Sequence, residues 1–285
     1  MGHGLGPGTV AAGPGTRLNT IDLAGTGSHH ARMACECAVD TIVGRLRHRP
    51  GETLGRHRHD CGFAALVLGG SYIEAGDRGR MRVAAGDVIL HGPYESHLDA
   101  VAGCGAEVLI LPWSDAVDSP LGKIDDADAI ARLAGRDIHQ AAALLRTTLR
   151  TAPMAVGDWP DRLAADLQRD PNLGLREWAD HAGLRPETIS RGFRQVFGIT
   201  AVEFRMRSRL LKALARMPDG GTLAGIALDA GFADQAHFSR SFRDLTGMAP
   251  RRWLASRMVA ARQWSSPCAS GGLALSRRPP IAGIQ

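Results

Sequence analysis

Residues 226–250 read IALDAGFADQAHFSRSFRDLTGMAP, and this stretch decides the fold of the C-terminal half of the chain. A short apolar run ends at Gly231, which suits the left-handed turn after a helix, and Asp234 is placed to cap a second helix. Gly247 ends that second helix, and Pro250 opens another short one. The apolar side that should face inward carries Phe232, Phe238 and Phe242. The stretch therefore predicts two helices joined by a tight turn.

The same layout occurs earlier in the chain, over residues 175–198. Gly183 supplies the turn, Pro186 suits the first turn of the second helix, and Gly198 ends it. A long helix over residues 201–217 would join the two units. Two short helices of this kind form a helix-turn-helix unit, whose second helix lies in the major groove of DNA. An ordinary helical domain with solvated arginines is the alternative, and the repetition of the layout argues against it.

The outward faces of the two second helices carry side chains that can read bases and bind phosphates. Arginine pairs with guanine, glutamine with adenine, and serine with several partners. Glu187 is unusual, because a carboxylate near DNA is repelled unless it accepts a hydrogen bond from cytosine. The predicted DNA-binding residues are Glu187, Thr188, Ser190, Arg191 and Arg194 in the first unit and Gln235, Ala236, Ser239, Arg240 and Arg243 in the second.

The charge is unevenly divided along the chain. Residues 159–285 hold 19 Lys and Arg against 11 Asp and Glu, a net charge of +8. Residues 1–158 hold 15 Lys and Arg against 18 Asp and Glu, a net charge of −3. A basic half joined to a mildly acidic half indicates that the basic half meets a polyanion, in agreement with a DNA partner.

The C-terminal motif resembles that of AraC-type transcriptional regulators. The second unit carries the resemblance in Ile226-Ala227, Ala230-Gly231-Phe232, Gln235, His237-Phe238-Ser239-Arg240, Phe242-Arg243, Gly247 and Pro250. The first unit carries it more loosely in Trp178-Ala179, Ala182-Gly183-Leu184, Ile189-Ser190-Arg191, Phe193 and Phe197-Gly198. The resemblance implies two recognition helices in successive major grooves, about 34 Å apart along the duplex.

Carried over by position, the resemblance assigns a role to each predicted DNA-binding side chain. The base readers would be Glu187, Ser190, Arg191, Gln235, Ala236, Ser239 and Arg240. Arg194 and Arg243 would contact phosphates, and His237 would pack against or cap its helix rather than bind a metal. The partners implied are a double-stranded DNA operator, a second copy of the chain in a homodimer, and RNA polymerase.

The N-terminal half reads as strands. Short apolar or alternating runs at residues 64–68, 80–83, 87–90 and 107–111 are separated by glycine and proline, which favours a small barrel or sandwich. Residues 126–135 and 137–150 then show helical spacing. The apolar stripe of the second helix could cover the strands or form a dimer seam, and the seam is the favoured interpretation. The stripe consists of Ile138, Ala141, Leu145 and Leu149.

Two segments of the strand half resemble the paired motifs of a cupin barrel. Gly51, His57, His59 and Gly70 match the first motif, and Gly86, Asp87 and His97 match the second. His57 and His59 alternate along a strand and therefore face the same side. Together with His97 they could hold a divalent transition metal such as zinc, iron, copper or nickel.

This sequence also departs from the metal-binding cupin pattern. Phe63 stands where a metal cupin carries glutamate, and Gly92, Tyr94 and Val101 replace the expected residues of the second motif. The barrel is therefore a firmer expectation than the metal, and Cys61 is a candidate for the missing ligand. The histidines could instead line a small-molecule pocket or hydrogen-bond within the barrel wall.

The predicted effector pocket consists of His57, His59, Cys61, Tyr72, Tyr94, His97 and Trp113. The leading hypothesis is a regulator whose pocket senses a small molecule or a metal and thereby modulates DNA binding. Two alternatives are a metal-dependent cupin enzyme that carries a DNA-binding tail, and a metal or redox sensor. Catalysis is not expected, because the carboxylate ligand is missing and no Ser/His/Asp pattern, phosphate-binding glycine loop or HExxH motif occurs.

Five cysteines are scattered through the sequence: Cys35, Cys37, Cys61, Cys104 and Cys268. Their odd number and irregular spacing predict reduced thiols rather than a disulfide framework. No apolar run approaches the ~18–20 residues of a membrane span, and the glycine-rich N-terminus lacks the features of a secretory signal. We therefore expect a cytoplasmic protein without a membrane partner.

These observations predict an α+β multidomain chain. An N-terminal cupin-like β-barrel precedes an all-α domain of two helix-turn-helix units joined by a linker helix. The predicted boundaries are a disordered N-terminus at 1–30, the barrel at 31–120, a helical dimerisation segment and linker at 121–157, the DNA-binding domain at 158–258, and a disordered tail at 259–285.

Overall fold

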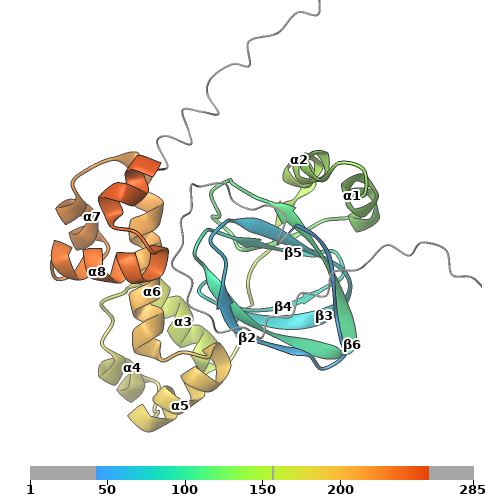
Figure 1. Cartoon of the computed structure of the whole chain (residues 1–285). Coiled ribbons are helices and arrows are strands. Elements are labelled where there is room, and N and C mark those ends of the chain that lie inside the picture. The colour runs from blue at the N-terminus through green and yellow to red at the C-terminus, as the bar shows by residue number, and fades with distance from the viewer. Residues whose placement is uncertain (1–42, 156, 257–285) are drawn as a thin grey trace, which may run out of the picture. The chain divides into compact units, whose positions relative to one another are not determined.

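The computed structural model describes residues 43–155 and 157–256. Both predicted disordered ends lie outside these residues, as do Cys35, Cys37 and Cys268. Within the described part, an antiparallel sheet comes first in the chain and a set of helices follows (Figure 1). This order agrees with the predicted fold class at the level of sheet followed by helices.

Within residues 43–155 and 157–256 the sheet has eight strands, and every pairing among them is antiparallel. The strands are β1 (Gly44–His48), β2 (Thr53–Arg58), β3 (Phe63–Gly76), β4 (Gly79–Ala84), β5 (Asp87–His91), β6 (Ser96–Pro112), β7 (Leu121–Lys123) and β8 (Arg150–Thr151). The long strands β3 and β6 pair along their whole length, from Phe63 opposite Pro112 to Gly76 opposite His97. The strands curve around a common interior (Figure 1), and the cupin barrel itself stays a prediction.

Side-chain alternation along β3 divides the sheet into two apolar faces. Ala64 and Leu66 point to one face, whereas Ala65 and Val67 point to the other. Both faces are buried, which explains why these strands read as continuous apolar runs in the sequence. The inner face holds the polar cluster described below.

Helices α1 (Ala127–Ala134) and α2 (Ile138–Thr148) cover the outer face. The side chains of Asp126 and Asp137 cap their N-termini. On α2, Ala141 and Leu145 have no exposed surface, because they pack against the strands. These buried positions of the stripe therefore cover the strands, as the alternative interpretation expects, and dimerisation through this segment stays a prediction.

The helical half begins after the predicted linker. Its helices are α3 (Trp159–Arg169), α4 (Leu175–His181), α5 (Pro186–Phe197), α6 (Ala201–Arg216), the 3₁₀ turn η2 (Met217–Asp219), α7 (Leu223–Asp229) and α8 (Gln235–Thr246), followed by a last helical stretch at 250–256. None of the helices in the described ranges is both long and apolar enough to span a membrane.

Two phenylalanine-centred cores build the helical half, and α6 runs through both of them. The first core joins α3, α4, α5 and the start of α6 around Phe193, Phe197 and Phe204. The second joins the end of α6 to α7 and α8 around Phe232, Phe238 and Phe242. The structure thus confirms two similar helix pairs connected by one long helix.

Candidate functional site

The α4–α5 and α7–α8 pairs share the same local construction. Gly183 and Gly231, which follow the first helix of each pair, have φ of +65° and +85°. A left-handed glycine allows the sharp turn that brings the second helix back across the first. Gly198 and Gly247 end the second helices with φ of +71° and +73°. The two pairs thus present α5 and α8 as equivalent helices.

The outer faces of α5 and α8 carry the predicted DNA-binding residues. Thr188 and Ser239 are half-buried, and the other eight are exposed: Glu187, Ser190, Arg191, Arg194, Gln235, Ala236, Arg240 and Arg243. Among the residues that the structure describes, none of the four exposed arginines forms a salt bridge. Their charges therefore remain available to an anionic partner.

His237 lies on the inner side of the start of α8. Its ring meets the ring of Phe232 edge-on at 5.4 Å, and its backbone N–H donates to the Asp234 side chain at 2.7 Å. This placement agrees with the predicted packing role. The Asp234 carboxylate caps the helix, and the backbone N–H groups of His237 and Ala236 hold its pKa below the usual value.

Two arginines of β2 hold the C-terminal ends of α5 and α8. Arg56 donates to the carbonyl oxygen of Phe197 at 2.8 Å, and Arg58 donates to that of Leu245 at 2.5 Å. Carbonyls in the last turn of a helix have no partner within the helix and attract cations. One short strand therefore contacts both helices that carry the predicted readers.

A buried carboxylate, Asp77, reinforces this contact. Its side chain is 1% exposed and pairs with both Arg56 and Arg207, the latter on α6. Arg207 donates to the two carboxylate oxygens at 2.7–3.0 Å, and the backbone N–H of Ser96 donates at 2.9 Å. Burial lowers the pKa of Arg56, and the attraction of Asp77 opposes that shift. Asp77 thus ties strands β2 and β6 to α6.

Between the two arginines of β2, His57 points into a cluster of imidazoles. It lies directly opposite His97 of β6, and their ring centroids are 4.4 Å apart. His59, just beyond the end of β2, lies 4.9 Å from His57 and 5.4 Å from His97. The ring nitrogens of the three residues come within 4.8 Å of one another. The structure therefore brings together the three histidines that the sequence singled out.

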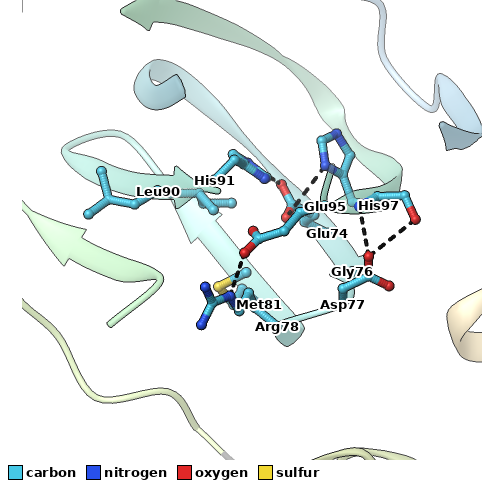
Figure 2. A pocket seen from close by; sticks show the side chains of 11 residues that line it. Glu74, Gly76, Asp77, Arg78, Met81, Leu90, His91, Glu95 and His97 are labelled. Carbon is cyan, nitrogen blue, oxygen red and sulfur yellow. Dashed lines mark hydrogen bonds and ion pairs between the residues drawn. The ribbon is translucent and has the colours of Figure 1, made fainter. Parts of the chain in front are cut away.

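A second group of potential ligands shares His97 and lies deeper, since all of its members are buried. Figure 2 shows these side chains. It consists of Glu74 from β3, His91 from β5 and His97, all buried. His91 Nε2 lies 3.4 Å from one Glu74 oxygen, and His97 Nδ1 lies 4.0 Å from the other. On its other side, His97 Nε2 faces Asp99 at 3.7 Å.

Burial sets the ionisation of this cluster. It lowers the pKa of His59 and of His91 to about 4, and that of His97 to about 3. It also raises the pKa of Glu74, against the attraction of His97, and raises that of Asp99 to about 8. The imidazoles of His59, His91 and His97 are therefore neutral near pH 7, and neutral imidazole is the form that binds metals.

The cluster also fits a metal on a geometric test. His91 Nε2, His97 Nδ1 and Asp99 Oδ1 are buried and have no hydrogen-bond partner within the described residues. Buried polar atoms are normally satisfied, so His91 Nε2 and His97 Nδ1, which both face Glu74, are suited to a bound group. Imidazole nitrogens with carboxylate oxygens suit zinc, iron, copper or nickel. When bound, such an ion would supply positive charge to these ligands.

The remaining predicted pocket residues lie in different places. Tyr72 is buried on the inner face of the sheet, near Glu74. Tyr94 packs instead into the second helical core, where its hydroxyl oxygen accepts from Trp253 Nε1 at 3.1 Å. Trp113 lies on the outer face beneath α2. Cys61 belongs to neither ligand group among the described residues. Tyr94 and Trp113 therefore do not line the histidine cluster.

Sequence reasoning missed Glu74, His91 and Asp99. Each is an ionisable residue buried in a strand. Glu74 follows Tyr72 by two positions and so shares its inner face, and His91 ends an apolar run. These residues could have been found in the sequence as acidic or imidazole side chains at strand positions that alternate with the apolar residues of the buried face.

Comparison with known proteins gives matches that centre on the helical half. Residues 178–256 match the family described as "Helix-turn-helix domain". The arabinose operon regulatory protein of Escherichia coli (strain K12) is 33% identical over 96 residues, which cover 32% of this chain and 32% of that protein. A putative AraC-like transcription regulator of Streptomyces lividans is 31% identical over 121 residues, 38% of this chain and 39% of that protein.

These matches span about a third of the length of either relative. Among solved structures, ToxT from Vibrio cholerae is 12% identical, with a TM-score of 0.37, over 74% of this chain and 97% of that one.

Proposed function

We propose that this chain, which matches a helix-turn-helix family over residues 178–256, is a sequence-specific DNA-binding regulator of transcription of the AraC type. In this proposal α5 and α8 enter the major groove of an operator, and the sheet senses a small molecule or a metal. The observation that carries it is the matched pair of exposed, arginine-bearing faces on two equivalently built helices.

The DNA-reading part of the proposal rests on charge and exposure. Arg191 and Arg240 occupy the same place on their helices, two residues before Phe193 and Phe242 of the cores. Both arginines are exposed and lack salt bridges within the described residues. Bidentate pairing of arginine with guanine is the commonest specific contact in the major groove.

The sensing part of the proposal rests on β2. His57 belongs to the histidine cluster, while its neighbours Arg56 and Arg58 hold the ends of α5 and α8. A ligand that changes the position of His57 would thereby change how firmly both reading helices are held. For this to regulate DNA binding, the ligand must bind the two arrangements with different affinity. A homodimer acting on paired half-sites stays part of the proposal.

Selection from a pool of random DNA duplexes with the full-length chain tests the proposal. We expect enrichment of one sequence, bound with an affinity that falls steeply as salt increases. The double variant Arg191→Ala/Arg240→Ala should lose the enrichment while keeping its far-UV circular dichroism. A folded wild-type chain that enriches no sequence would refute DNA reading by these helices.

A further inference from the structure

Three strands bring one carboxylate and two imidazoles together inside the sheet. Glu74 comes from β3, His91 from β5 and His97 from β6. Antiparallel pairing to β3 holds these strands, with Phe63 opposite His91 of β5 and with Glu74 and Gly76 opposite Asp99 and His97 of β6. Such pairing fixes the three side chains on rigid elements rather than on loops, as a preformed site requires.

We propose that Glu74, His91 and His97 bind a divalent first-row transition metal ion, and that Glu74 supplies the carboxylate that the cupin-like pattern lacks at Phe63. This site uses only His97 of the three histidines singled out in the sequence. The proposal goes beyond the regulatory function and does not depend on DNA binding.

The separations between the ligand atoms support this assignment. Two atoms bound at about 2.1 Å to a tetrahedral ion lie about 3.4 Å apart. His91 Nε2 and the nearer Glu74 oxygen are 3.4 Å apart, and His97 Nδ1 and the other oxygen are 4.0 Å apart. Both distances are too long for good hydrogen bonds. The first matches the separation across a tetrahedral ion and the second is longer, while one ligand atom from each of the three residues lies within 4.8 Å of the others.

The surroundings favour an ion over an organic ligand. Glu74, His91 and His97 line a small pocket inside the sheet, shown in Figure 2, which leaves little room for an organic ligand. Glu74 and Asp99 place two carboxyl groups in this interior, and neither pairs with a Lys or Arg among the described residues. A divalent cation would favour the ionised form of these carboxyl groups, which burial otherwise disfavours.

The alternative triad, His57–His59–His97, is less complete. His57 and His59 are only half-buried, and the triad has no carboxylate. His57 Nδ1 donates to the carbonyl oxygen of Gly55 at 2.9 Å, which orients its ring. Because both triads need His97, one ion at the deeper site would leave His57 and His59 as its neighbours rather than its ligands.

Metal analysis of the full-length protein tests the assignment. The protein is stripped with a chelator, titrated with Zn²⁺ by calorimetry, and examined with Co²⁺ by visible absorption and elemental analysis. We expect one ion per chain and a metal-dependent rise in melting temperature. Glu74→Gln and His91→Ala should each weaken Zn²⁺ binding by more than the about 10–100-fold typical of residues outside the coordination shell.

His139→Ala is the matched control, because His139 is exposed on α2, and it should bind Zn²⁺ as the wild type does. His59→Ala discriminates between the two triads and should change affinity much less than His91→Ala. Two results would overturn the assignment: a folded wild-type chain that binds no ion, or binding lost in His59→Ala but kept in Glu74→Gln and His91→Ala. Melting curves recorded in the presence of chelator show whether each variant is folded. DNA selection tests the regulatory proposal and does not depend on the metal assignment, so the failure of one proposal can be distinguished from the failure of the other.

Discussion

At the scale of single residues, the DNA-reading proposal predicts how much affinity is lost when Arg240 is removed. It is exposed on α8, and the core residue Phe242 fixes the helix face from which it projects. We predict that Arg240→Ala weakens binding to the selected DNA by about 1–3 kcal/mol and relaxes specificity at one base pair. Fluorescence anisotropy measures the affinity. Arg132→Ala, which removes an exposed arginine on α1, should leave it unchanged.

Asp77 is a buried charged residue whose removal should cost considerable stability. It is buried and pairs with two arginines, so Asp77→Ala leaves both charges without their partner. We predict a loss of about 3 kcal/mol in the free energy of unfolding, measured by urea denaturation. The matched control is Asp115→Ala, because Asp115 pairs with Arg146 at a half-exposed site. Equal losses in the two variants would contradict the role given to Asp77.

Single residues also show how far the sequence could predict the site. His57, His59 and His97 were identified because their spacing matches a motif, and the structure brings them together. Glu74 and His91 were not, because they meet His97 only through pairing between strands distant in sequence. Spacing along one chain segment carries no information about which strands will become neighbours.

At the scale of elements, α2 shows what periodicity can and cannot predict. Helical spacing correctly predicted the helix and its apolar stripe, but not the surface that the stripe contacts. Any apolar surface of suitable shape satisfies such a stripe, so a second copy of the chain and the chain's own sheet were equally compatible with it.

The observed packing of α2 gives a stability prediction. Leu145→Ala should cost about 2–5 kcal/mol in the free energy of unfolding, because it leaves a cavity beneath α2. The association state of the Leu145→Ala variant, measured by sedimentation, should be the same as that of the wild type. Thr147→Ala, at an exposed position of the same helix, should cost little. Destabilisation that depends on protein concentration would instead indicate that the stripe lies in a dimer interface.

Strand β2 is the element that should couple sensing to DNA reading. We predict that Arg58→Ala speeds amide hydrogen exchange in the last turn of α8, because the Leu245 carbonyl loses its partner there. Hydrogen–deuterium exchange with mass spectrometry measures this effect. Arg82→Ala, which removes an exposed arginine of β4, is the control. Unchanged exchange in α8 would show that β2 does not hold this helix.

At the scale of the whole molecule, the order of sheet and helices followed from sequence periodicity, whereas the contacts between them did not. Ala75 of β3 packs into the first helical core, and Tyr94 packs into the second. Both residues looked like ordinary strand or pocket residues in the sequence. The burial of these two residues depends on how α3 to α8 pack against the sheet. A local sequence pattern cannot predict such long-range packing.

The central claim is that α5 and α8 read two neighbouring DNA segments as one module. Deep sequencing of duplexes selected by the full-length chain, compared with those selected by Arg191→Ala and Arg240→Ala, tests it most directly. We predict two enriched segments whose centres lie about 10–10.5 base pairs apart, one helical turn. Each variant should relax the base preference at a position within one segment and leave the other segment unchanged. A single enriched segment, or two segments weakened alike by either variant, would contradict the claim.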